Sequence, residues 1–140
     1  MSLYLDTSVI VPLFLPDPFV ARARAFLSTG PSGLIVSDFA SAEFASVVGI
    51  RLRMKLSTEA ESRSAFANFD DWVRRKTTVI EIGRSNLIDA TAMLRRLDLT
   101  LRTLDAIHLA AAQARNAELA TFDAGMARSA RALGISIIAL

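Results

Sequence analysis

The feature that most constrains the fold is the alternation of very short apolar runs with longer stretches of helical periodicity. Runs with the length and composition of buried strands occur at Leu3–Leu5, Leu34–Val36, Thr78–Ile82, Leu119–Thr121 and Ser136–Ala139. Strands that alternate with helices pair in parallel, because the intervening helix returns the chain across the sheet. The sequence therefore predicts an α/β fold with three layers (α/β/α), in which helices flank both faces of a central, short-stranded parallel sheet.

The helical segments between these runs account for most of the remaining chain. A first helix is expected between Asp6 and the break at Pro16–Pro18. The others are expected at Phe19–Leu27, Asp38–Lys55, Ser57–Arg75, Gly83–Leu97, Leu104–Asn116 and Ala124–Leu133. The 140 residues are 52% hydrophobic and 21% charged, which excludes disorder and suits a single domain over residues 1–140.

The chain has no cysteine, and His108 is its only histidine. Disulfides, iron–sulfur clusters, thiolate zinc sites and sites with several imidazoles are therefore excluded, and a Ser–His–Asp triad would have to use His108. The glycines are scattered and form no phosphate-binding loop. No run reaches the roughly 18 apolar residues of a membrane span, and the N-terminus has no basic region. We expect neither a membrane anchor nor a signal peptide, which favours the reducing cytoplasm.

Three aspartates lie where strands end or helices begin. In LYLDTS, Asp6 ends the first strand; in TLDAIHLAAA, Asp105 lies in the first turn of a helix; in ATFDAGMA, Asp123 follows a strand. Each has an ordinary explanation, because aspartate caps helix N-termini and complements the helix dipole. Taken singly, none of the three indicates a function.

Glu43 is harder to explain as a structural residue. At about 100° per residue, it falls within an apolar stripe of the expected helix formed by Phe39, Val47, Ile50 and Met54. A lone buried carboxylate is strongly unfavourable unless it is paired or neutral. The ordinary alternative is a buried ion pair or a place at the rim of the core.

Together the four acids point to a metal site. Strand ends and the helix starts that follow them share one edge of a parallel sheet, so Asp6, Glu43, Asp105 and Asp123 are expected to converge. Clustered carboxylates repel one another, and a hard divalent cation resolves that conflict. Oxygen-only ligation favours Mg²⁺, with Mn²⁺ as the alternative.

The remaining charge suits a polyanionic substrate. With these four acids set aside, 10 of the 14 acids remain against 16 basic residues. The candidate phosphate contacts include Arg51, Arg53, Lys55 and Arg102. For most basic residues on helices the ordinary alternative is a solvated surface charge.

At these residues the sequence resembles the PIN-domain family, and within it the toxins of VapBC-type toxin–antitoxin pairs. The resemblance covers nearly the whole chain. It is carried by YLDTSVIVPLF, by Ser41–Glu43, by TLDAIHLAAA and by ATFDAGMARSARALG, in this order.

The resemblance implies a Mg²⁺-dependent endoribonuclease that hydrolyses RNA phosphodiester bonds with a metal-activated water. It carries the family's acidic quartet over to Asp6, Glu43, Asp105 and Asp123, and the hydroxyls near the metal to Thr7 or Ser8 and to Thr121. It also implies a homodimer and a small antitoxin protein whose tail enters the active groove. His108 is outside the family pattern and is expected to be a buried or half-buried structural residue.

Two other functions remain open on the sequence alone. A phosphatase of the haloacid dehalogenase type also begins with a strand-end aspartate, but it needs a second acid two residues later, where this chain has Ser8. A non-catalytic PIN-like module that binds RNA or a protein is the other alternative. The four acids argue against it, since a pure binding module has no need of them.

Overall fold

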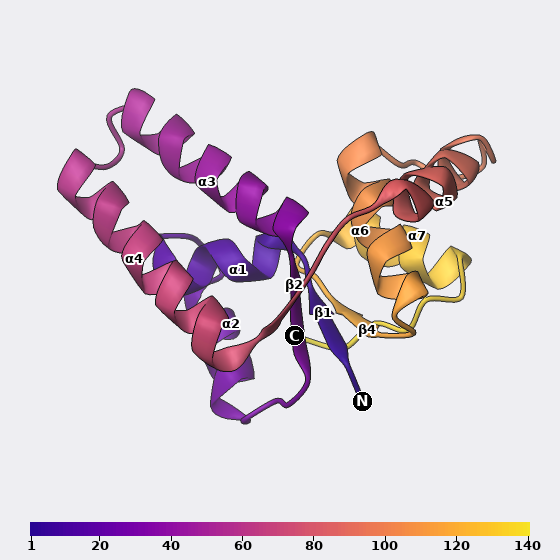
Figure 1. The fold of residues 1–140 in the computed structure, drawn as a ribbon, viewed down its shortest axis with the longest axis horizontal. Coiled ribbons are helices and arrows are strands. Elements are labelled where there is room, and N and C mark those ends of the chain that lie inside the picture. The colour runs from indigo at the N-terminus through magenta and orange to yellow at the C-terminus, as the bar shows by residue number, and fades with distance from the viewer.

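A computed structural model describes residues 1–140 and shows a four-stranded parallel sheet with seven helices (Figure 1). The strands are β1 (Leu3–Leu5), β2 (Leu34–Ser37), β3 (Thr78–Ile80) and β4 (Glu118–Ala120), in the order β3-β2-β1-β4. The helices are α1 (Thr7–Phe14), α2 (Val20–Ser28), α3 (Asp38–Arg53), α4 (Glu59–Lys76), α5 (Arg84–Leu94), α6 (Thr103–Ala114) and α7 (Ala124–Ala132). The predicted three-layer α/β/α fold with a parallel central sheet is confirmed.

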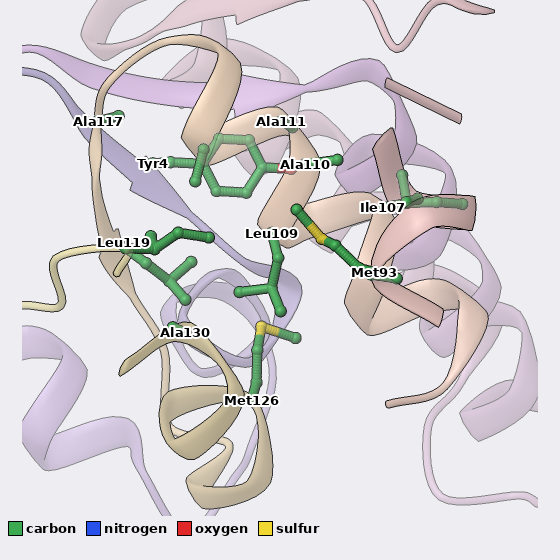
Figure 2. Close-up of a cluster of buried hydrophobic side chains, with 14 of the residues drawn as sticks. Tyr4, Met93, Ile107, Leu109, Ala110, Ala111, Ala117, Leu119, Met126 and Ala130 are labelled. Carbon is green, nitrogen blue, oxygen red and sulfur yellow. The ribbon is translucent and has the colours of Figure 1, made fainter. Parts of the chain in front are cut away.

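Alternate residues of the short strands face two separate cores. Leu3 and Leu5 of β1 pack with α1, α2, α3 and α4, whereas Tyr4 packs with α5, α6 and α7. Figure 1 shows these two groups of helices on opposite sides of the sheet. Figure 2 shows the second core, where Tyr4 and Leu119 of the sheet lie near Leu109 of α6 and Met126 of α7. Both faces of β1 are therefore buried, as expected for the inner strands of a parallel sheet.

The prediction of a fifth strand at Ser136–Ala139 is wrong. Only Ile137 pairs with the sheet, through an isolated bridge to Leu119. The Leu119 N–H donates to Ser136 O at 2.8 Å, and the Ile138 N–H donates to Leu119 O at 3.0 Å. In the three-residue strand β4, only the middle residue, Leu119, turns its backbone groups away from β1. A longer ladder with residues 136–139 therefore cannot form.

The expected helices form, with ends that differ by a few residues from the expected ones. The Ser37 hydroxyl caps α3 by accepting from Ala40 N–H at 3.0 Å, and Thr58 and Glu61 form a capping box at the start of α4. The strand expected to run to Ile82 ends at Ile80, because Ile82 N–H donates to the Asp38 carboxylate instead. None of the helices combines the length and apolar character needed to cross a membrane.

Candidate functional site

The four predicted acids come from four elements that meet at the carboxyl edge of the sheet. Asp6 follows β1, Glu43 lies in the second turn of α3, Asp105 in the first turn of α6, and Asp123 immediately precedes α7. In a parallel sheet this edge is where loops and helix N-termini gather, and it is where ligand sites form in open α/β folds.

Asp6 is buried and fully hydrogen-bonded. Its side chain caps α1, because Oδ1 accepts from the Ser8 N–H at 2.9 Å and from the Ser8 hydroxyl at 2.6 Å. Its Oδ2 accepts from the Thr121 hydroxyl at 2.7 Å. Only 2% of the residue is exposed. Burial raises the pKa of Asp6, and the hydrogen bonds from Ser8 and Thr121 oppose that rise.

The predicted hydroxyl residues join the acids to one another. The Ser8 hydroxyl accepts from Phe122 N–H at 2.9 Å, and the Thr121 hydroxyl accepts from Asp123 N–H at 3.0 Å. Asp123 in turn caps α7 by accepting from Met126 N–H at 2.9 Å. The helix-cap explanation thus holds for Asp6 and Asp123, and both caps lie at the same site.

Glu43 does not lie in the middle of the buried face of α3, and the helical-wheel prediction was wrong on this point. The buried residues of α3 are Ala40, Phe44 and Val48, whereas Ile50 and Met54 are exposed. An apolar stripe on a wheel does not show which part of it meets the core, and here the sheet and α1 select a neighbouring stripe. Glu43 is half-buried at the edge of that face and turns toward the sheet edge.

A chain of hydrogen bonds joins Glu43 to the interior of the sheet. The Thr7 hydroxyl donates to Glu43 Oε1 at 2.7 Å, and the same oxygen forms a short hydrogen bond with His108 Nε2. His108 Nδ1 lies 2.8 Å from the Tyr4 hydroxyl, which lies 2.9 Å from the Ser37 hydroxyl. A carboxylate only accepts, so His108 donates from Nε2 to Glu43, and its Nδ1 continues the chain to the Tyr4 hydroxyl.

These hydrogen bonds affect the pKa of Glu43. Burial disfavours the carboxylate, but the hydrogen bond and the charge of His108 outweigh burial, and the pKa of Glu43 is lowered. Sequence reasoning expected a buried His108, which is correct at 2% exposure, but missed its contact with Glu43. A signal existed: His108 is one helical turn beyond Asp105, and Tyr4 precedes Asp6 by two residues.

Asp105 and Asp123 share one cation, the guanidinium of Arg102. Arg102 donates from Nε to Asp105 Oδ2 at 3.2 Å and from Nη2 to Asp105 Oδ1 at 3.4 Å. The same Nη2 lies 3.8 Å from Asp123 Oδ2. The pKa of Arg102 is raised first by hydrogen bonding to Asp105 and its charge, then by the charges of Asp123 and Glu43. Of the four basic residues predicted to contact phosphate, Arg102 is thus the one within reach of the acids.

The other three predicted phosphate contacts lie toward the far end of α3. Arg51 is occupied by Asp17 at 3.7 Å and by the Pro16 carbonyl. Arg53, the last residue of α3, is roughly 15 Å from Glu43 along the helix axis, and Lys55 follows the end of the helix. Figure 1 shows this end of α3 pointing away from α6. A substrate that touched them would have to extend well beyond the acids.

The four acids are close but do not surround a single point. No group of three carboxylate or imidazole side chains is arranged to hold one metal ion in this structure. Each acid has its own partner: hydroxyls for Asp6, His108 for Glu43, and Arg102 for Asp105 and Asp123. The donors themselves fit a hard divalent cation, because all four are carboxylates and neither sulfur nor a second imidazole is present.

The comparisons with known proteins agree with this fold. The PIN domain family matches residues 3–132. The chain therefore belongs to the PIN-domain family.

Several of the proteins similar to this chain are named VapC or VapBC. Ribonuclease VapC46 of Mycobacterium tuberculosis is 33% identical over 141 residues, covering 99% of this chain and 97% of that protein. The crystal structure of M. tuberculosis VapC20, a Sarcin-Ricin loop cleaving toxin, has a TM-score of 0.76 at 18% identity and covers 99% of this chain and 100% of that one. VapBC2 from Rickettsia felis, bound to a DNA fragment from its promoter, has a TM-score of 0.69 at 17% identity, with coverages of 99% and 98%.

Proposed function

We propose that residues 1–140 form one catalytic PIN domain, a Mg²⁺-dependent endoribonuclease that acts as the toxin of a toxin–antitoxin pair. The observation that carries this proposal is the grouping of Asp6, Glu43, Asp105 and Asp123, from four separate elements, at one edge of the sheet. Capping requires only two of these acids. Glu43, paired with His108, and Asp105, paired with Arg102, bring two further carboxylates to the same edge.

The relatives support the activity. VapC46 is a ribonuclease, and VapC20 cleaves the Sarcin-Ricin loop. VapC46 is similar to this chain over almost the whole length of both proteins, so the comparison is not confined to a short motif. We extend ribonuclease activity to this chain on that basis.

In the proposed site, Asp6, Glu43, Asp105 and Asp123 would hold the Mg²⁺, or Mn²⁺ in its place. A bound divalent cation would supply an activated water and would neutralise charge on the phosphate. The chain's own residues keep the carboxylates in place. Thr7 fixes Glu43, and Ser8 and Thr121 fix Asp6 by hydrogen bonds of 2.6 to 2.7 Å.

Basic side chains on both sides of the acids favour a polyanionic substrate. Arg102 lies at the mouth of the site, and 76% of its side chain is exposed. A cavity of about 160 Å³ adjoins Asp123 and is lined in part by Thr121, Arg22 and Arg131. We place the RNA backbone over Arg102 and this cavity. Arg51, Arg53 and Lys55 would contact only a longer RNA.

Two protein partners belong to the proposal. We propose an antitoxin, because the similar Rickettsia felis structure is a VapBC complex. We also propose a homodimer. Its support is the group of exposed apolar side chains Ile50, Met54 and Leu56 at the far end of α3, which a lone soluble chain gains nothing by exposing.

The test is cleavage of total cellular RNA by the purified chain, with Mg²⁺ and again with EDTA. We expect discrete new RNA 5′ ends with Mg²⁺ and none with EDTA. Intact RNA after incubation with folded, Mg²⁺-loaded protein would favour the non-catalytic binding module instead.

A further inference from the structure

Arg102 has an unusual place among the arginines of this chain. It is the residue before α6, and its side chain bends over the first turn to Asp105 and reaches across to Asp123 before α7. The other arginine pairs lie away from the four acids: most, such as Arg96 with Asp98, join residues close in sequence, and Arg51 pairs with Asp17. Arg102 is the only basic side chain paired with two of those acids.

The position of this guanidinium corresponds to an electrostatic need. Asp105 is buried and Asp123 half-buried, and two carboxylates held close together repel each other unless a positive charge lies between them. Arg102 supplies that charge from the same chain. It also accounts for the present arrangement, in which Asp105 and Asp123 face a guanidinium instead of joining the other acids around one point.

We propose that Arg102 is an intrachain counter-cation, which holds Asp105 and Asp123 in the cation-free protein and leaves them when a divalent cation binds. This inference rests on the proposed function, because it assumes that the same carboxylates take the metal. A guanidinium and a metal ion at the same two carboxylates repel each other, because both are positively charged. The two cations therefore compete, and the competition lowers the apparent affinity for the metal.

The exposure of Arg102 suits such an exchange. With 76% of its side chain exposed, it can swing into solvent without disturbing the core. Hydrogen bonds of 3.2 and 3.4 Å from an exposed arginine are weak enough to be broken. Arg102 is thus a positioning residue for the cation-free state and sets how much cation is needed to load the site.

The first measurement is Mn²⁺ binding to the full, RNA-free chain by isothermal titration calorimetry. Arg102→Gln removes the competitor, so its Kd should fall roughly threefold to tenfold below that of the unaltered chain. Arg96→Gln is the matched control, since it breaks an exposed arginine pair away from the acids, and its Kd should not change. Equal or weaker binding by a folded Arg102→Gln protein would overturn the inference.

The second measurement separates displacement from a simple change in net charge. In the unaltered chain, saturating Mg²⁺ should move the NMR signal of the Arg102 Nε–H toward that of a free guanidinium and speed its exchange with water. An unchanged signal at saturation would show that Arg102 stays in place, and would overturn the inference while leaving the proposed function intact. If neither the unaltered chain nor Arg102→Gln binds Mn²⁺, the proposed function fails together with this inference.

Discussion

At the scale of single residues, Asp6 combines a structural role with the proposed chemical one. It caps α1, yet it is buried, and that burial raises its pKa, so the ionised form is less favourable than it would be in water. Asp6→Asn removes the buried charge and keeps most of the hydrogen bonds with Ser8 and Thr121. We expect RNA cleavage to be lost while the melting temperature in EDTA stays within a few degrees. A variant that cuts RNA at the original rate would remove Asp6 from the site.

The Tyr4 hydroxyl gives a second test at this scale. Tyr4→Phe leaves Nδ1 of His108 and the hydroxyl of Ser37 without their buried partner. We expect a loss of about 1–3 kcal/mol in the free energy of unfolding, measured with urea. Ser28→Ala is the control, because its hydroxyl is bonded only to Ala25 O on the exposed surface, and it should change little. Equal stability of both variants would mean that the buried hydrogen bonds of Tyr4 contribute nothing to the free energy of unfolding.

The positions of Asp6 and Asp123 could be predicted because each follows a strand, whereas Asp105 lies in α6, which follows α5 and no strand. The spacing of His108 from Asp105 signalled its place beside the site, but not its contact with Glu43, since that depends on how α3 and α6 approach each other across the sheet edge. The pairing of Arg102 with Asp105 was available in principle from their spacing of three residues on a helix. The contact of Arg102 with Asp123 could not be predicted, because it depends on how α6 and α7 are placed relative to each other.

At the scale of the elements, the turn before β2 shows how closely β1 and β2 fit. Gly33 and Gly30 both adopt left-handed φ angles, +67° and +68°. A Cβ on Gly33 would lie 2.8 Å from Met1 O, whereas a Cβ on Gly30 would meet nothing within 4 Å. Gly30→Ala should therefore lower stability by about 1 kcal/mol through backbone strain alone. Gly33→Ala should lower it further, because Leu3 N–H donates to Gly33 O and the clash disturbs that pairing.

The urea midpoints of these two variants provide the comparison. A larger shift for Gly33→Ala than for Gly30→Ala is the expected result. Equal shifts would mean that β1 and β2 separate easily at this end.

The elements also show what sequence patterns determine. The starts of α3 and α4 were signalled by the capping residues Ser37 and Thr58, whereas α2 and α6 begin without a side-chain cap. Ser136–Ala139 had a strand-like composition but found only one residue of β4 to pair with. Pairing depends on the neighbouring strand, and composition alone does not reveal it.

At the scale of the whole molecule, a cation that binds only the folded chain stabilises it. At about 100 times its Kd, Mg²⁺ should add about 2.7 kcal/mol to the free energy of unfolding. Differential scanning calorimetry in EDTA and in Mg²⁺ measures the effect as a rise in melting temperature. Asp105→Asn should lose most of the rise, whereas Asp98→Asn should keep it, because Asp98 is exposed and pairs only with Arg96. A rise of equal size in both variants would indicate nonspecific binding.

The central claim is that these four acids cut RNA with a divalent cation. The most direct measurement is the cleavage rate of one cellular RNA pool in Mg²⁺ by the unaltered chain, by Asp105→Asn and by Asp98→Asn. We predict that the unaltered chain and Asp98→Asn produce the same new RNA ends, and that Asp105→Asn and every EDTA sample produce none. Cleavage by Asp105→Asn at the rate of the unaltered chain, or cleavage that survives EDTA, would contradict the account.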